Sequence, residues 1–191
     1  EHVFAVGGDP AEPEGPFPDA LSIIRTGLLR DYGTREVSIA GYPEGHPDIA
    51  ASVLWEHLDE KAQAIAEQDL ASVIITQFAF DTDPVMSWID QVRARGIDAE
   101  IRIGTPGPAG IKRLISFARR FGVGANAMIV KKYGFSLTNL MGTAGPDRFV
   151  TDLSRLLAAD PASGAVRLHM YAFGGLDATA EWARDYTAAL R

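Results

Sequence analysis

One layout recurs along the chain and constrains its fold more than any other feature. A short apolar run is followed by a loop rich in glycine, proline or aspartate, and usually by a stretch with helical periodicity. The five apolar runs are Val3–Val6, Glu36–Ala40, Ser72–Thr76, Ala99–Ile103 and Val166–Tyr171. This alternation predicts βα units built around a parallel sheet. Because the runs are continuous rather than alternating, we expect both faces of the sheet to be covered.

Six segments are predicted to be helices from their apolar spacing and from the prolines and glycines that border them. They are Pro18–Leu29, Ile49–Gln68, Pro84–Arg95, Gly110–Phe121, Asp147–Ala159 and Ala178–Leu190. The stretch Gly122–Gly145 suggests helices broken by glycines. No linker is long enough to divide the chain, so we expect residues 1–191 to form one α/β domain, either a single layer or a barrel.

Composition excludes several classes of function. The chain has no cysteine, which excludes thiolate catalysis, disulfides and cysteine-ligated zinc, and its four histidines lack metal-ligand spacing. With 18 Lys and Arg against 25 Asp and Glu, the net charge is −7, which disfavours nucleic acid as a partner. No apolar window reaches the roughly 18 residues of a membrane span and no signal peptide opens the chain. We therefore expect a cytoplasmic protein with small-molecule ligands.

Polar residues that follow strands are the candidate site residues, because ligands bind at the carboxyl ends of parallel strands. Gly7, Gly8 and Asp9 come first. The glycines permit close approach of a ligand to the backbone, and the carboxylate stands at the strand mouth. A tight turn capped by Asp9 is the alternative. The sequence Gly-x-Gly-x-x-Gly is absent, so this loop is not a Rossmann phosphate-binding turn.

Two further loops carry unusual side chains. The hexapeptide Tyr42-Pro43-Glu44-Gly45-His46-Pro47 holds an aromatic ring, a carboxylate and an imidazole between two prolines; a rigid connector is the alternative. Gln77 ends the third strand beside aromatic residues. Its amide suits the mixed hydrogen-bonding edge of a heterocycle, or it satisfies buried backbone groups.

Taken in order, Gly-Gly-Asp-Pro, Tyr-Pro-Glu-Gly-His-Pro, the helical Leu58-Asp59-Glu60-Lys61 and Ile-Thr-Gln-Phe-Ala-Phe-Asp resemble the methylenetetrahydrofolate reductase family. The resemblance continues through Gly96-Ile97, Ile101–Gly104 and Leu168–Tyr171. It implies a (β/α)8 barrel of TIM type, of which about five βα units are visible here as its C-terminal part. It also implies an enzyme that binds FAD and reduces 5,10-methylenetetrahydrofolate to 5-methyltetrahydrofolate with NAD(P)H.

The same resemblance implies a role for each matching residue. Asp9 and Gln77 would bind the pterin and act in catalysis, and Lys61 would lie near the FAD phosphates; for Lys61 a solvated helix face is the alternative. The implied cofactor contacts are Gly7, Gly8, Asp9, Ala20, Tyr42, His46 and Lys61, and the implied substrate contacts are Asp9, Gln77, Ile111 and Tyr171.

Departures from the family pattern leave other functions open. Gly7 replaces a common Arg, Pro106-Gly107-Pro108 replaces an apolar segment, and Ala172-Phe173-Gly174-Gly175 stands where an Arg often lies. The family's first three strands, with their general-acid Glu, have no counterpart, so we expect a longer protein of roughly 250–300 residues. A flavin-free tetrahydrofolate-binding or methyl-transfer protein and a non-catalytic subunit are the alternatives. A homo-oligomer is compatible with the sequence.

Overall fold

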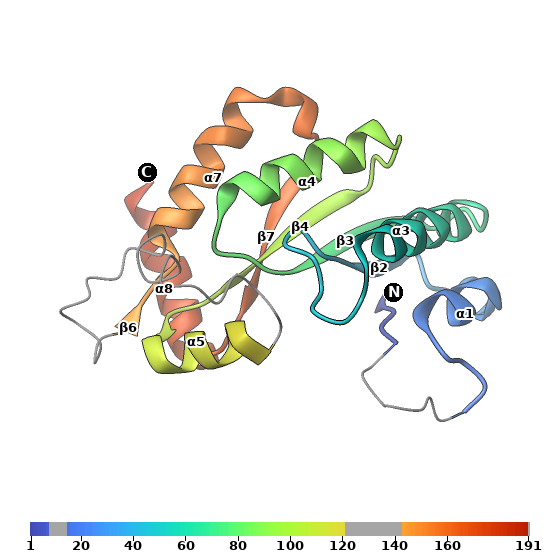
Figure 1. Ribbon diagram of the computed structural model, residues 1–191, viewed down its shortest axis with the longest axis horizontal. Helices are drawn as coiled ribbons and strands as arrows, with labels where there is room; N and C mark the ends of the chain where they lie inside the picture. Colours follow the sequence, from blue (N-terminus) through green and yellow to red (C-terminus); the bar gives the residue numbers. More distant parts are fainter. Residues whose placement is uncertain (8–14, 121–142, 191) are drawn as a thin grey trace.

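The computed structural model describes residues 1–7, 15–120 and 143–190, and within them five parallel strands form one sheet (Figure 1). The strands are β1 (His2–Phe4), β2 (Glu36–Gly41), β3 (Ala71–Phe78), β4 (Glu100–Pro106) and β7 (Val166–Tyr171), in the spatial order β1-β2-β3-β4-β7. The predicted parallel α/β sheet is confirmed. β1 and β7 are its two edges and do not pair with each other, so the described residues form an open sheet, and the closed barrel that the resemblance implies is not seen in them.

The helices lie close to their predicted positions. They are α1 (Ala20–Arg25), α2 (Leu28–Asp31), α3 (Ala51–Ala66), α4 (Thr82–Ala94), α5 (Ile111–Arg120), α7 (Asp147–Ala159), the 3₁₀ turn η2 (Pro161–Ser163) and α8 (Leu176–Ala189). None of these described helices is long and apolar enough to cross a bilayer.

Two boundaries differ from the prediction. The first predicted helix is split at Gly27, whose φ of 76° is left-handed and ends α1 before α2 begins. Gly110, predicted to start a helix, instead belongs to β5 (Ala109–Gly110), which pairs antiparallel with β6 (Thr143–Ala144). Most of the stretch predicted to hold broken helices lies outside the described residues.

The main hydrophobic core lies between one face of the sheet and the helices α1, α3, α4 and α7 (Figure 1). Val37 and Ile39 of β2, Ile74 of β3, and Ile101 and Ile103 of β4 are almost fully buried there. Successive side chains of a strand point to opposite faces, so these alternate residues define the helix-covered side. Their burial anchors each strand and thereby fixes where its carboxyl end lies.

The opposite face of the sheet carries charged side chains, which the interpretation of the strands as continuous apolar runs did not predict. Arg102 Nε donates to Glu100 Oε1 at 2.7 Å, and Arg167 Nε lies 2.7 Å from Glu100 Oε2. Glu36 continues the network, 3.6 Å from Arg102 and 2.9 Å from His2. The hydrogen bond from Arg102, together with the charge of Arg167, holds the pKa of Glu100 below its usual range.

The two unusual loops after β4 and β7 are packed onto each other. Gly107 N donates to the Tyr171 carbonyl at 2.8 Å, and a Cβ added at Gly107 would clash with Thr179. A Cβ added at Gly174 would clash with the Pro108 carbonyl oxygen. Glycine at position 174 therefore lets the two loop backbones approach, and glycine at position 107 leaves room for the Thr179 side chain of α8. Through the contact of Gly174 with Pro108, the two departures from the family pattern are sterically linked.

We expect Gly174→Ala to destabilise the fold by about 1–3 kcal/mol, because the methyl group must push the Pro108 backbone aside. Denaturant unfolding would measure the loss. Gly110→Ala is the matched control, since an added Cβ there meets no atom of the described residues within 4 Å. Equal stability of the two variants would contradict the close approach of these loops.

We also expect the charge network to stabilise the protein in a pH-dependent way. The pKa of Glu100 is lowered in the folded state, so its contribution is present above the unfolded pKa of about 4.3 and is lost as the pH falls through the folded value. Glu100→Gln should cost about 1 kcal/mol or less at pH 7. The difference from wild type should shrink on acidification, whereas Glu56→Gln, an exposed α3 substitution, should be neutral throughout.

Candidate functional site

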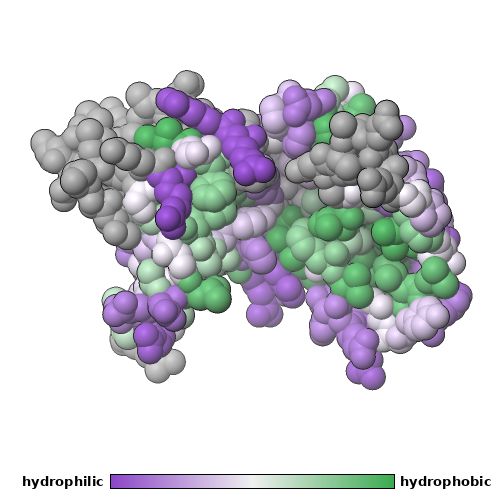
Figure 2. Space-filling model, turned by 90° about the horizontal axis from the view of Figure 1, so that it is seen from below, coloured by the Kyte–Doolittle hydropathy of each residue, from purple (hydrophilic) through white to green (hydrophobic). Residues whose placement is uncertain are grey.

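A cavity of about 610 Å³ opens at the carboxyl ends of β1, β2 and β3, where the sequence predicted a site. Six of the predicted site residues line it together: Gly7, Ala20, Tyr42, His46, Lys61 and Gln77. Its volume lies within the roughly 300–1,000 Å³ typical of small-molecule sites. In the view from below, hydrophobic residues gather over the half of the molecule that carries α1 (Figure 2).

Tyr42 and His46 come from the loop that follows β2. Their rings meet edge to face, with centroids 5.6 Å apart. His46 Nδ1 accepts a hydrogen bond from Asp48 N at 3.2 Å, which leaves the proton of the neutral ring on Nε2. Glu44 Oε1 accepts from Phe80 N at 3.2 Å and so ties this loop to the end of β3. The hexapeptide is thus a rigid loop that presents an imidazole N–H donor.

Gln77 stands at the end of β3, beside an irregularity in the pairing with β4. Its Oε1 accepts from Phe78 N at 3.1 Å. The carboxamide NH₂ makes no hydrogen bond to any residue that the structure describes. A side chain at the cavity wall with one fixed acceptor and two unused donors can hydrogen-bond to the carbonyl or ring nitrogen of a heterocycle.

One flank of α3 forms the long wall of the cavity. Val53, His57 and Lys61 follow each other at intervals of four residues and all line it, because residues four apart share one face of a helix. Leu58 and Ile65, on another face, are buried in the core and fix the helix on the sheet. The sequence analysis named Lys61 but not Val53 or His57. Their positions eight and four residues before Lys61 would have placed them on the same face of the helix.

Lys61 brings a cation to the cavity wall. No described residue lies within hydrogen-bond or ion-pair distance of its amino group, and burial lowers its pKa while the charge of Asp19 acts in the opposite direction. Asp19 caps α1, its Oδ1 accepting from Ser22 N at 2.7 Å. A partly buried ammonium group facing a cavity is suited to an anionic ligand such as a phosphate.

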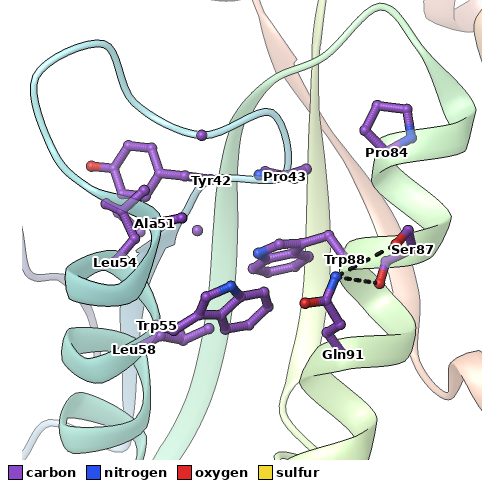
Figure 3. A pocket seen from close by; sticks show the side chains of 13 residues that line it. Tyr42, Pro43, Ala51, Leu54, Trp55, Leu58, Pro84, Ser87, Trp88 and Gln91 are labelled. Atoms are coloured by element: carbon purple, nitrogen blue, oxygen red, sulfur yellow. Dashed lines mark hydrogen bonds between the residues drawn. The ribbon is translucent and has the colours of Figure 1, made fainter.

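A second cavity of about 200 Å³ lies on the other side of Tyr42, between α3 and α4 (Figure 3). Trp55 and Trp88 stack there with centroids 5.8 Å apart, and the Arg95 guanidinium lies 4.5 Å from the Trp55 ring. A Cβ at Gly41 would lie 2.8 Å from Trp88, so glycine lets this indole reach the end of β2. The Trp88 indole thus packs close to the backbone that carries Tyr42.

The remaining predicted site residues are not part of the first cavity as described. Gly8 and Asp9 lie outside the described residues. Ile111 begins α5, and its side chain is likewise outside them. Tyr171 packs among aromatic rings, and its hydroxyl donates to the Thr76 carbonyl at 3.0 Å. Burial raises the pKa of Tyr171, and its described contacts are those of a packing residue.

Comparison with known proteins places these features in a family. The family model described as methylenetetrahydrofolate reductase matches residues 1–176. The chain belongs to this family. It is 35% identical over 118 residues to 5,10-methylenetetrahydrofolate reductase of Pectobacterium carotovorum, covering 61% of this chain and 38% of that protein. It is 31% identical over 184 residues to methylenetetrahydrofolate reductase 1 of Schizosaccharomyces pombe, covering 89% and 28%.

A plant relative extends the comparison. Methylenetetrahydrofolate reductase (NADH) 1 of Zea mays is 30% identical over 135 residues, which cover 64% of this chain and 22% of that protein. The chain therefore spans well under half the length of these relatives. The matched region includes every residue that lines the first cavity, since the family model runs from residue 1 to residue 176.

Lys61→Met should separate ligand binding from folding. The pKa of Lys61 is lowered by burial, so its charged form opposes folding at neutral pH, and an apolar side chain of similar length removes that cost. We expect an unchanged or higher melting temperature, together with roughly tenfold weaker binding of a phosphate-bearing ligand. Fluorescence titration with FAD measures the second effect. Arg184→Met, which removes an exposed cation from α8, should alter neither; a large loss of stability in Lys61→Met would contradict the assignment.

Proposed function

We propose that the full-length protein is a flavin-dependent reductase that converts 5,10-methylenetetrahydrofolate to 5-methyltetrahydrofolate with NAD(P)H. One observation carries the proposal: Lys61, a cation with no close partner among the described residues, and Gln77, whose NH₂ group donates to no described residue, line the same cavity at the carboxyl edge of the sheet. A flavin dinucleotide needs both kinds of contact, one for its diphosphate and one for its ring system. Membership of the family supports the same reaction.

The residues around the cavity fit FAD. Lys61 offers a point charge for a phosphate oxygen, His46 offers its Nε2–H, and Val53 with Leu54 offers apolar surface. A Cβ at Gly7 would be 3.6 Å from Asp19 Cα, in ordinary contact, so the glycine there leaves space without being sterically required. Bound FAD would accept a hydride from NAD(P)H and deliver it to the folate.

The overall reaction is balanced by one hydride and one proton. NAD(P)H is oxidised to NAD(P)⁺, and the hydride adds to the bridging methylene carbon. The bond from that carbon to N10, the aminobenzoate nitrogen, breaks and N10 takes up a proton, so that the methyl group stays on N5 of the pterin. Gln77 would orient the pterin through its NH₂ donors, and Asp9, by family resemblance, would accept from the pterin edge and stabilise the cationic iminium. Binding at the strand ends would hold the folate next to the hydride donor, which raises the effective concentration of the two reactants.

A flavin-free folate-binding protein is the second candidate, favoured by the missing Arg at position 7. The visible spectrum of the purified full-length protein separates the two. For the reductase, NADH or NADPH should bleach the flavin absorbance without oxygen, and methylenetetrahydrofolate should restore it. Absence of saturable FAD binding at high micromolar concentration would remove the reductase proposal.

The variant Gln77→Ala tests whether the Gln77 amide binds the folate rather than FAD. The amide is proposed to serve the pterin, so the variant should bind folate about 5- to 100-fold more weakly, as expected for the loss of one buried hydrogen-bond partner, and should bind FAD with little change. Parallel titrations with tetrahydrofolate and FAD measure both affinities. Equal weakening of the two ligands, together with a lower melting temperature, would show instead that Gln77 supports the loop.

A further inference from the structure

The second cavity, between α3 and α4, takes no part in the proposed reaction. It shares the wall around Tyr42 with the first cavity, but its volume is only about 200 Å³, below the roughly 300 Å³ at which sites for drug-sized ligands begin. An apolar cavity of about 150 Å³ can hold a benzene ring. The second cavity therefore has room for one aromatic ring with a small substituent, and it is too small for a dinucleotide.

The walls of the second cavity are largely flat rings. Tyr42 comes from the loop after β2, Trp55 from α3, and Pro84 and Trp88 from α4 (Figure 3). The Trp55 indole is already held in place, because it stacks on Trp88 and lies 4.5 Å from the Arg95 guanidinium. Preformed flat surfaces favour a planar ring, since binding such a ring costs little additional ordering of side chains.

Two polar side chains of α4 stand at one edge of these walls. Gln91 Nε2 donates to the Ser87 carbonyl at 3.1 Å and lies 3.5 Å from Ser87 Oγ. Figure 3 shows the Gln91 side-chain oxygen turned toward the two indoles. This Oε1 accepts no hydrogen bond from any residue that the structure describes, and the Ser87 hydroxyl proton is not used by the bonds to Gln91. The edge thus offers an acceptor next to a donor.

A primary carboxamide presents the complementary pair, an N–H donor beside a carbonyl acceptor. We propose that the second cavity binds a small neutral aromatic carboxamide. Its ring packs against the indoles, its N–H donates to Gln91 Oε1, and its carbonyl accepts from the Ser87 hydroxyl. An aromatic carboxylate is disfavoured, because it has no donor for Gln91 Oε1 and sets a negative charge against that oxygen. The proposal does not depend on the binding of FAD or on the reductase activity.

The test is a titration of the full-length protein with benzamide, followed by the indole N–H resonances of isotope-labelled tryptophan. The resonances of Trp55 and Trp88 should shift and saturate with a dissociation constant of roughly 0.1–10 mM, as expected for a ligand of so few atoms. The resonance of Trp182, which stacks on Tyr186 and does not line the cavity, should not move. Absence of saturable shifts of Trp55 and Trp88 well above that range overturns the proposal.

Two analogues and one variant test the amide contact. Benzoate and N,N-dimethylbenzamide keep the ring but lack the amide N–H, so they should bind at least about fivefold more weakly than benzamide. Gln91→Leu removes the acceptor, and benzamide should then bind about 3- to 10-fold more weakly, with an unchanged melting temperature because Gln91 is exposed. Gln63→Leu, an exposed α3 substitution outside the second cavity, is the matched control and should bind benzamide as wild type does. Equal binding of benzamide to Gln91→Leu and to wild type overturns the proposal.

Variants of the first cavity separate the two sites. Lys61 and Gln77 line the first cavity and not the second, so Lys61→Met and Gln77→Ala should leave the affinity for benzamide unchanged. Weaker binding of benzamide in either variant, with full binding in Gln91→Leu, would place benzamide in the first cavity and overturn this inference. If FAD does not bind but benzamide binds with the expected dependence on Gln91, the reductase proposal fails and this inference stands.

Discussion

The packing of α3 against the sheet is the contact on which the site depends. Leu58 and Ile65 are buried in the core, and that burial sets the rotation of the helix about its own axis. Once the rotation is set, Val53, His57 and Lys61 can only point along the flank toward β1 and α1, where the cavity lies. The hydrophobic effect thus places Lys61 on the cavity wall without a close ionic contact between Lys61 and any described residue.

Local sequence chemistry predicted much of the fold and several of the residues that line the first cavity. Strand–loop–helix alternation was sufficient for the five parallel strands, and residues that follow a strand, such as Tyr42 and Gln77, share a cavity because the carboxyl ends of parallel strands meet at one edge. The split at Gly27 was missed because the apolar pattern continues across it while the backbone turns left-handed. The pairing of Gly110 with Thr143 was missed because a two-residue ladder has no periodicity.

The charged sheet face shows a different limit of sequence reasoning. Glu100 and Arg102 alternate with Ile101 and Ile103, which is the period-two pattern of a strand with only one apolar face. Because the run Ala99–Ile103 was interpreted as continuously apolar, this alternation was missed. Glu100 pairs with Arg102 of its own strand and with Arg167 of β7, which lies 67 residues further along the chain. Only the strand order reveals that these charges compensate one another.

The distribution of charge matters more to this site than its total. The chain carries a net charge of −7, which on average opposes an anionic ligand. The described residues that line the cavity include one carboxylate, Asp19, which caps α1, and one lysine, Lys61, which has no close partner among the described residues, so the local charge is closer to balance than that of the whole chain. Partial burial weakens screening by water, so the nearby cation outweighs distant surface charges. A ligand with a compact anionic group and an apolar ring is the kind that such an arrangement selects.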